Sequence, residues 1–329
     1  MLPSVPVIQA SGLWKRFGSY DAVRGVDITV QSGECVGLLG PNGAGKTSIV
    51  RMIYGLSPIS AGRLEVFGEA ISSHARSIKA RIGVVAQEDN LDPVLTVREN
   101  LEVYAGYFRL PAAEARKRAE EILAFMELEE KAEDTVENLS GGMKRRLAVG
   151  RGLINQPHLL LLDEPTTGLD PFARHLVWQR LRRLKAAGTT MLLTTHYMEE
   201  ASQLCDRLII LHQGEIVEEG SPRGLVRQHA GKEAVELGIA AKELPALLQP
   251  VAAQVRGHQR FGDDVVLFTD HGLELMDAVC RESAVRGIEL RYRQLRQANL
   301  EDVFLRLTGM NLREEQDDSG EAERKGGAE

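Results

Sequence analysis

One loop in this sequence carries the residue types needed to hold the phosphates of a nucleotide. It reads Gly40-Pro41-Asn42-Gly43-Ala44-Gly45-Lys46-Thr47, which fits the pattern of glycine, four residues, glycine, lysine and serine or threonine. A strand-like run at 35–39 leads into it, and a helix-compatible run follows from Ser48. Glycines let backbone N–H groups turn toward phosphate oxygens, and a helix N-terminus adds partial positive charge. We predict that Lys46 reaches the terminal phosphates and that the Thr47 hydroxyl binds Mg²⁺; a glycine-rich turn without a ligand is the alternative.

Two adjacent carboxylates mark a second place where chemistry could occur. Asp163 and Glu164 follow the apolar strand-like run 159–162. Alternating strands and helices predict a parallel sheet, and such sheets bind ligands at the carboxyl ends of their strands. We assign Asp163 to Mg²⁺, opposite Thr47, and Glu164 to the attacking water as general base. An acidic loop at a strand end is the alternative.

A second turn has the features of an anion-binding site. Ser140 is a good helix N-cap, and Gly141 and Gly142 leave the amides of the first helical turn uncovered. The phosphate loop already serves one nucleotide, so this turn would most simply serve a nucleotide held by another copy or a partner. An ordinary capped helix is the alternative, and the local features do not decide between the two.

The segment Leu139–Gly142 resembles the signature of the ATP-binding cassette (ABC) family. The resemblance covers about residues 7–220. Many relatives have tyrosine where this chain has Phe17, and phenylalanine keeps the stacking face but loses the hydroxyl. The other family markers follow in order: the adenine-stacking aromatic at Phe17, the glutamine loop at Gln87, the Walker B end and catalytic glutamate at Asp163 and Glu164, the D-loop at Gly168-Leu169-Asp170, and the switch histidine at His196.

The resemblance implies ATP hydrolysis with Glu164, His196 and Gln87 as catalytic residues. His196 would contact the γ-phosphate and stabilise its developing charge, and Gln87 would contact the metal and the attacking water. Thr47, Gln87 and Asp163 would hold Mg²⁺. Without the resemblance, His196 would be interpreted as a structural histidine and Gln87 as a surface amide.

The resemblance also implies that two copies share each ATP. Lys46 and Thr47 of one chain and Ser140 and Gly142 of the other would hold the nucleotide, so that binding closes the dimer and hydrolysis reopens it. The implied nucleotide-binding residues are Phe17, Gly40, Pro41, Asn42, Gly43, Ala44, Gly45, Lys46, Thr47, Ser48, Ser140, Gly141, Gly142 and Asp170.

Three segments resemble a subgroup of ABC exporters that includes antibiotic-resistance and nodulation-type lipo-oligosaccharide exporters. They are 90–101, 195–207 and 300–309. Members pair with separate six-helix membrane subunits, which implies a permease as partner and a position at the cytoplasmic face of the membrane. A groove lined by the glutamine loop and the helices of 97–133 would grip the permease. Cargo meets the membrane subunit, so these residues do not identify it.

Composition limits the class of protein. Of the 329 residues 43% are hydrophobic and 26% are charged, with a net charge of −7 and a pI of about 5.7. A general nucleic-acid binder would have a basic face, so we predict no nucleic-acid partner and interpret the basic run 144–146 as a solvated helix face. The start has no signal-peptide pattern, and no apolar run approaches the roughly 18 residues of a membrane span. The cysteines, Cys35, Cys205 and Cys280, are unclustered and predicted to be reduced thiols.

Strand and helix patterns predict two domains and a tail. Together with the resemblance, they imply that residues 1–220 form an α/β P-loop NTPase cassette with a mixed sheet core and an inserted helical subdomain at about 90–155. Residues 221–309 form a small α+β ferredoxin-like domain with the order β-α-β-β-α-β, and the acidic residues 310–329 are predicted to be disordered. The second domain has predicted strands at 234–237, 253–255, 265–268 and 288–291 and helices at 242–248, 273–285 and 300–307.

Three other functions compete with transport. A soluble ABC ATPase of translation would usually carry two cassettes, whereas this chain has one set of motifs. A DNA-repair ABC ATPase would need a long coiled coil between Lys46 and Ser140, where no sustained heptads occur. A binding module with a dead site is not favoured, because Lys46, Asp163, Glu164 and His196 are all present.

Overall fold

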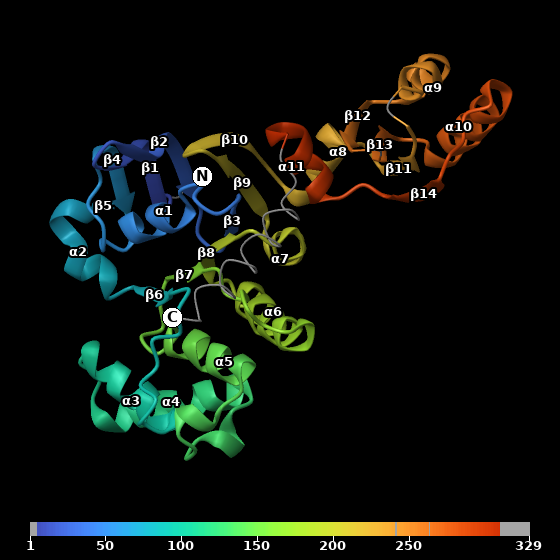
Figure 1. The fold of residues 1–329 in the computed structure, drawn as a ribbon. Helices are drawn as coiled ribbons and strands as arrows, with labels where there is room; N and C mark the ends of the chain where they lie inside the picture. The colour runs from blue at the N-terminus through green and yellow to red at the C-terminus, as the bar shows by residue number, and fades with distance from the viewer. Residues whose placement is uncertain (1–4, 241, 263, 310–329) are drawn as a thin grey trace, which may run out of the picture. The chain divides into compact units, whose positions relative to one another are not determined.

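The chain divides into two compact units between Glu219 and Gly220, one residue before the expected boundary. The computed structural model describes residues 5–309 with the exception of 241 and 263 (Figure 1). The predicted disordered tail at 310–329 lies outside the described residues.

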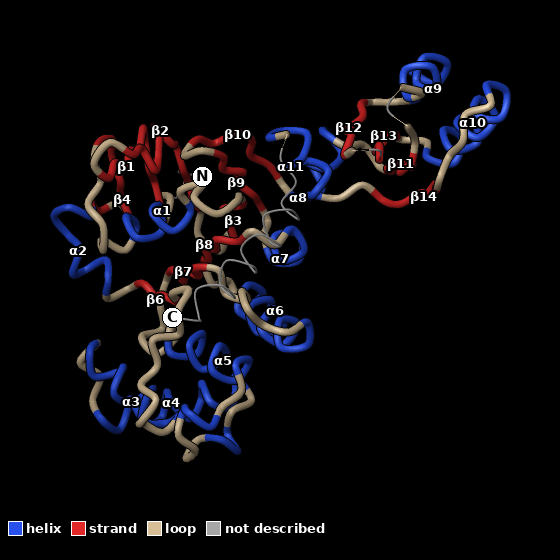
Figure 2. Tube along the Cα trace, viewed as in Figure 1, coloured by secondary structure: helices blue, strands red, loops and turns tan. Residues whose placement is uncertain are grey.

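A six-stranded sheet forms the centre of the first unit, with its strands in the order β10-β9-β3-β8-β7-β6 (Figure 2). From β9 to β6 the neighbouring strands are parallel. β7 carries four consecutive leucines that are fully buried, as expected for a strand covered on both faces. The strands are β3 Cys35–Leu39, β6 Ile82–Val85, β7 Leu159–Asp163, β8 Thr190–Thr195, β9 Arg207–His212 and β10 Glu215–Gly220.

The first unit also contains a separate antiparallel sheet. Its order is β2-β1-β4-β5. Side chains from this sheet, from α1 and from the parallel sheet form one apolar core that includes Ile28, Ile49 and Leu161. The elements are β1 Ile8–Phe17, β2 Tyr20–Val30, β4 Ala61–Val66, β5 Glu69–Ala70, α1 Lys46–Ile53 and α2 Ile71–Lys79.

Helices fill the stretch of chain between β6 and β7, where the inserted helical subdomain was expected. Thr96 and Glu99 form a capping box at the start of α3, and Pro111 is the N-cap residue of α4. Within the described part of the chain, no helix has the length and apolar character to cross a bilayer. The helices of the first unit from here on are α3 Val97–Tyr107, α4 Ala112–Met126, α5 Gly141–Arg151, α6 Pro171–Ala186 and α7 Met198–Leu204.

The second unit contains a four-stranded antiparallel sheet in the order β12-β13-β11-β14. From β11 to β14 the elements follow one another as β-α-β-β-α-β, the order of the split βαβ arrangement. Leu237, Leu267 and Leu247 contribute to a core between the sheet and the helices α9 and α10. The elements are α8 Pro222–His229, β11 Glu233–Gly238, α9 Leu244–Val251, β12 Gly257–Phe261, β13 Asp264–Thr269, α10 Gly272–Arg286, β14 Tyr292–Gln297 and α11 Leu300–Thr308.

Two strand predictions in this unit were wrong. Residues 253–255 lie in and just after a 3₁₀ helix, Ala252–Gln254, and the strand begins at Gly257. Residues 288–291 are irregular, and β14 begins at Tyr292. β12 and β14 are the edge strands of the sheet and carry mainly polar residues. The strands were therefore predicted at the more apolar runs that precede them.

Several elements were not predicted: α2, α8, β5, β9 and β10. β10 and α8 bury few side chains, which leaves a weak pattern. β9 is different, because its run from Leu208 to Leu211 is fully buried and could have been identified as a strand.

The subgroup-like segment 300–309 has a structural explanation. Asp302 is 1% exposed, accepts two hydrogen bonds of 2.7 Å from the Arg296 guanidinium, and forms a capping box with Asn299 at the start of α11. Glu236 accepts a third bond from Arg296 at 2.6 Å. A buried carboxylate needs such partners, so this ion pair fastens α11 to the sheet.

We predict that Asp302→Ala destabilises the second unit by about 3 kcal/mol, because it leaves the Arg296 charge without its main partner. The two tryptophans, Trp14 and Trp178, both lie in the first unit. Hydrogen exchange in β11 should therefore accelerate while the urea midpoint by tryptophan fluorescence stays unchanged. Glu274→Ala, an exposed first-turn carboxylate of α10, is the matched control. Equal exchange in both variants would contradict the prediction.

Candidate active site

The phosphate loop connects β3 to α1 with the backbone that its glycines permit. Gly43 and Gly45 have positive φ values of 80° and 100°. A Cβ atom on Gly45 would lie 2.4 Å from the backbone oxygen of Ala22, so no larger residue fits there. Gly45 is also the N-cap of α1 and brings no capping side chain, which leaves the N-terminal N–H groups of the helix to an anion.

Lys46 lies at the centre of the site and is only 5% exposed. Its Nζ donates to the backbone oxygens of Gly40 and Pro41 at 2.8 and 3.0 Å and lies 3.6 Å from Oε1 of Glu164. A buried ammonium needs acceptors, and the loop carbonyls and Glu164 supply them. The lysine is thus held next to the loop where phosphate oxygens would compete for it.

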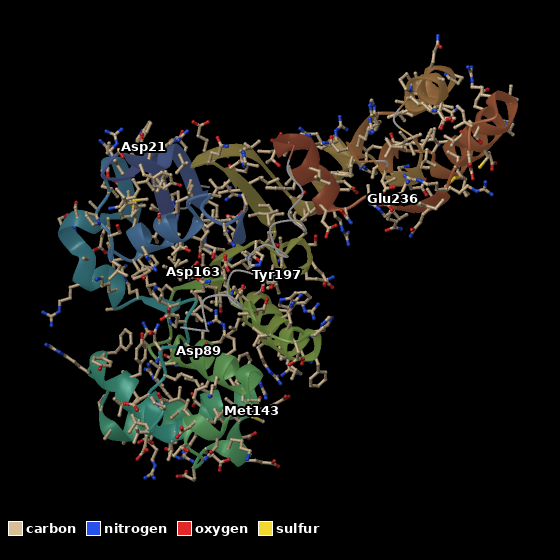
Figure 3. The ribbon with its side chains drawn as sticks, viewed as in Figure 1. Asp21, Asp89, Met143, Asp163, Tyr197 and Glu236 are labelled. Atoms are coloured by element: carbon tan, nitrogen blue, oxygen red, sulfur yellow. The ribbon has the colours of Figure 1, made fainter. Side chains whose placement is uncertain are left out.

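Asp163 and Thr47 meet as the sequence predicted. Thr47 Oγ1 donates to Asp163 Oδ1 at 3.1 Å, and Thr194 Oγ1 donates to the same oxygen at 2.6 Å. β3 and β7 both pair with β8, so parallel register brings these side chains to one edge of the sheet, where Figure 3 labels Asp163. One carboxylate and one hydroxyl are hard oxygen donors that suit Mg²⁺.

Glu164 is a buried carboxylate, 6% exposed, and lies between the side chains of Lys46 and His196. Its Oε1 lies 3.3 Å from Nδ1 of His196 and 3.6 Å from Nζ of Lys46, while Oε2 accepts from Thr167 Oγ1 at 3.1 Å. Burial alone would raise the pKa of Glu164. The close approach of the His196 ring, followed by the charge of Lys46, outweighs burial and lowers that pKa to about 2.

The backbone of Glu164 is also unusual. Its φ of 47° lies in the left-handed region, which few non-glycine residues occupy. Its N–H donates to the Oγ1 and the backbone oxygen of Thr194 at 3.0 and 3.2 Å. Contacts with the neighbouring strand thus help to fix the turn that directs this carboxylate toward Lys46.

The β1–β2 hairpin brings two aromatic residues to the phosphate loop. Phe17 is 52% exposed, and Lys15 Nζ lies 4.7 Å from its ring centroid. Tyr20 pairs with Phe17 across the hairpin, and its hydroxyl donates to the backbone oxygen of Gly43 at 3.2 Å. Phe17 was predicted from the sequence and Tyr20 was not, although both lie at the same turn.

Gln87 differs from the other catalytic candidates. Its side chain is exposed, and within the described residues it makes no hydrogen bond with Thr47 or Asp163. Its backbone oxygen accepts a bond of 3.1 Å from Arg145. The structure therefore does not place the Gln87 side chain in the metal site.

The signature turn lies at the start of α5, and it does not join the phosphate loop of its own chain. Ser140 is the N-cap and accepts from the Met143 N–H at 3.3 Å. A Cβ atom on Gly142 would lie 2.7 Å from Cβ of Ala173, so α5 packs closely on α6, whose N-cap is Asp170. Figure 3 places Met143 beside this turn, apart from Asp163 at the end of β7.

The basic run 144–146 corrects our interpretation of a solvated helix face. Arg145 and Arg146 are 3% and 8% exposed and donate hydrogen bonds to backbone oxygens. Arginine can be buried in this way because its guanidinium presents five donors. The sequence signal that could have found them is the position of both residues on the helix that Ser140 caps.

Comparison with known proteins identifies the family. A family model described as "ABC transporter" matches residues 23–167, and a model of the C-terminal domain of nodulation factor export protein NodI matches 246–309. A Nod factor export ATP-binding protein I of Ralstonia nicotianae is 47% identical over 315 residues, covering 94% of this chain and 96% of the relative. The corresponding Burkholderia thailandensis protein is 48% identical and covers 94% and 100%.

The chain belongs to the ABC transporter family. It is the ATP-binding and ATP-hydrolysing subunit of an ABC exporter and works with membrane subunits and as a dimer. A solved dimeric ATP-binding cassette in a post-hydrolysis state, bound to ADP and Pi, aligns with a TM-score of 0.60 and 30% identity, covering 65% of this chain and 98% of its own. Similarity to export proteins along nearly the whole chain decides against the translation and DNA-repair alternatives.

Two threonines whose hydroxyls contact the carboxylates of Asp163 and Glu164 were not predicted from the sequence. Thr194 and Thr167 each donate to one of these carboxylates. Threonine at a strand end or in a turn is common, so no residue type or spacing distinguished these two. Their roles follow from strand register and from the turn after β7.

The low pKa of Glu164 generates a stability prediction. Because the pKa is about 2 in the folded protein and 4.5 in the unfolded reference, ionised Glu164 stabilises the fold above pH 4.5 and loses that effect as pH falls toward 2. Over this window the unfolding free energy of wild type should fall by about 3 kcal/mol more than that of Glu164→Gln. Urea unfolding followed by tryptophan fluorescence measures it.

The control for this measurement is Glu137→Gln, which changes an exposed carboxylate. Its unfolding free energy should follow the wild-type pH curve. Parallel curves for wild type and Glu164→Gln between pH 4.5 and 2 would contradict the proposed electrostatic role of His196 and Lys46.

Proposed function

We propose that each ATP is enclosed between two copies of this chain. The carrying observation is the separation of the two anion-binding elements: the phosphate loop and Asp163 lie at one edge of the parallel sheet, and the exposed Ser140 turn lies apart from them on α5 (Figure 3). A second copy could bring its Ser140, Gly141, Gly142 and Asp170 to the phosphates. Binding then favours the closed dimer because ATP contacts both halves.

On the first copy, Lys46 would exchange the carbonyls of Gly40 and Pro41 for β- and γ-phosphate oxygens. The N–H groups of the loop and of α1, from Gly43 to Ser48, would hold the same phosphates. Phe17 would stack on adenine, since its ring is half exposed at a hairpin that Tyr20 attaches to Gly43. These contacts use side chains and amides that already face the loop.

Thr47 and Asp163 would hold Mg²⁺, with phosphate oxygens and water completing the coordination. The described residues offer no cluster of three or more His, Cys, Asp or Glu, which suits a metal that binds mainly with its nucleotide. When bound, Mg²⁺ would neutralise charge on the phosphates. Gln87 would have to turn inward to contribute, so we propose its role only for the closed dimer.

Glu164 would orient and polarise the attacking water as general base, since its carboxylate lies beside Lys46 and His196 where the phosphates would bind. Phosphoryl transfer passes through a loose transition state in which water need not lose its proton early, so positioning is the larger contribution. His196, beside Glu164, would stabilise negative charge on the γ-phosphate.

A groove in the first unit supports the proposal that this chain binds a membrane subunit. It has a volume of about 1540 Å³ and lies between α2, β6, the loop after Gln87 and α3. Tyr104, Tyr107 and Phe108 form an edge-to-face aromatic cluster there, with Tyr107 78% exposed. Basic residues on the lining outnumber acidic ones: Arg76, Lys79, Arg109, Arg118 and Arg151 against Asp92.

We propose that a cytoplasmic helix of a six-helix permease binds in this groove through apolar and acidic residues. Aromatic grooves of this kind bind amphipathic helices. The chain would then act at the cytoplasmic face of the membrane. Relatives are named for Nod factor export, and we propose an export system of that branch as the assembly that this chain powers.

A mixing experiment tests the shared nucleotide site. Lys46→Ala and Ser140→Arg chains should each be inactive alone, because every site in either homodimer carries a defect. Mixed dimers would pair the intact Lys46 of one chain with the intact Ser140 of the other. Mixing equal amounts should therefore recover roughly a quarter of the wild-type ATPase rate.

The controls are each variant mixed with an equal amount of buffer and a mixture of Lys46→Ala with Lys46→Ala plus Ser140→Arg, which contains no intact pair. Failure of the complementary mixture to exceed these controls, while wild-type chains exchange subunits normally, would refute the shared site.

The groove generates a second test. Tyr107→Glu places a carboxylate in the aromatic cluster and should lower the fraction of chain that sediments with permease-containing membranes by about fivefold or more. Val285→Glu, at a residue of α10 that is 82% exposed, is the matched control and should sediment as wild type does. Equal sedimentation of both variants would exclude the groove as the docking site.

A further inference from the structure

Arg145 lies on α5, the helix capped by Ser140, and its side chain runs inward to the catalytic edge of the sheet. The residue is 3% exposed. Nothing in the ATP-binding scheme above uses it. Within the described part of the chain, its buried guanidinium nevertheless makes more hydrogen bonds around the active site than the side chain of any assigned catalytic residue does.

One side of the guanidinium holds the turn that carries the two carboxylates. Nη2 donates to the backbone oxygens of Asp163 and Glu164 at 3.2 and 2.9 Å, and Nε donates to that of Pro165 at 2.6 Å. Three consecutive carbonyls therefore depend on one side chain. They surround the left-handed φ of Glu164, a backbone conformation that persists only where neighbouring groups enforce it.

The other side holds the glutamine loop. Nη1 donates to the backbone oxygens of Ala86 and Gln87 at 2.7 and 3.1 Å and to Oδ1 of Asp89 at 3.0 Å. Arg151, two turns further along α5, donates to the backbone oxygens of Asp89 and Asn90. Arg145 and Arg151 thus attach the glutamine loop, which runs from β6 to the groove, to α5 by hydrogen bonds.

We infer that Arg145 is a positioning residue for ATP hydrolysis: it fixes the Asp163–Pro165 turn and the glutamine loop to α5, so that the Glu164 carboxylate and the Ser140 turn keep one relative geometry. The guanidinium is suited to this because its planar fork bonds several carbonyls at once, whereas an ammonium is a point charge with three donors. The inference depends on ATP hydrolysis by the chain and not on the shared nucleotide site.

Arg146 shows that a buried arginine on α5 need not form hydrogen bonds with the carboxylate turn and the glutamine loop. It is 8% exposed, and its Nη1 donates to the backbone oxygens of Met126 and Glu127 at 2.7 and 3.2 Å. Both partners belong to the helical part of the unit, away from the carboxylate turn. Arg146 is therefore a matched control with similar burial and different partners.

The test compares Arg145→Gln, Arg145→Lys and Arg146→Gln in the full chain, with kcat and KM for ATP and the urea midpoint measured on each. Arg145→Gln should lower kcat by about tenfold or more with KM within about threefold, because the phosphate loop is intact and the water-orienting group is displaced. Arg145→Lys should recover part of kcat. Arg146→Gln should lower the urea midpoint comparably while kcat of the folded protein stays within about twofold.

A kcat for Arg145→Gln within twofold of wild type, or an equal loss in Arg146→Gln, would overturn the inference. If Arg145→Gln does not fold, Asp89→Ala provides the decisive comparison, since it removes one acceptor whose side chain is 31% exposed. It should lower kcat about threefold, whereas Glu88→Ala, its exposed neighbour, should not. Equal kcat in these two variants would then refute the link.

Discussion

The buried carboxylate of Glu164 is the constraint on which the rest of the first unit depends. A carboxylate that is 6% exposed is stable only with charge-complementary partners, and Lys46 and His196 provide them from two neighbouring loops. This arrangement requires β3, β7 and β8 to end side by side, which the parallel sheet achieves. ATP would change it directly, because phosphate oxygens compete with Glu164 for Lys46.

The same unit separates its two anion-binding turns. The phosphate loop follows a central strand, whereas the Ser140 turn begins a helix of the inserted subdomain. Arg145 joins these parts within the chain through backbone oxygens, and a second copy would join them across ATP. Hydrogen bonds from Arg145 and Arg151 to residues 86–90 thus connect the carboxylate turn, the glutamine loop and α5.

The second unit follows a different principle. Its sheet buries one set of side chains against α9 and α10, and its last helix is fixed by the Arg296–Asp302 pair. This explains the acidic residue Asp302 in the first turn of α11: it accepts a hydrogen bond from the Asn299 N–H in the capping box and neutralises Arg296. The segment therefore contributes to the stability of the unit.

The sequence by itself determined the local features of this protein. The phosphate loop, the strand before Asp163 and the N-cap at Ser140 were all predictable, because glycine freedom, apolar runs and capping act over a few residues. Tertiary structure decided the rest. The pKa of Glu164, the hydroxyl of Thr194 on Asp163, the Tyr20 contact with Gly43 and the burial of Arg145 depend on partners distant in sequence. The edge strands at 257 and 292 also escaped prediction, because polar edge residues carry little periodic signal and only pairing with a neighbouring strand makes them β-structure.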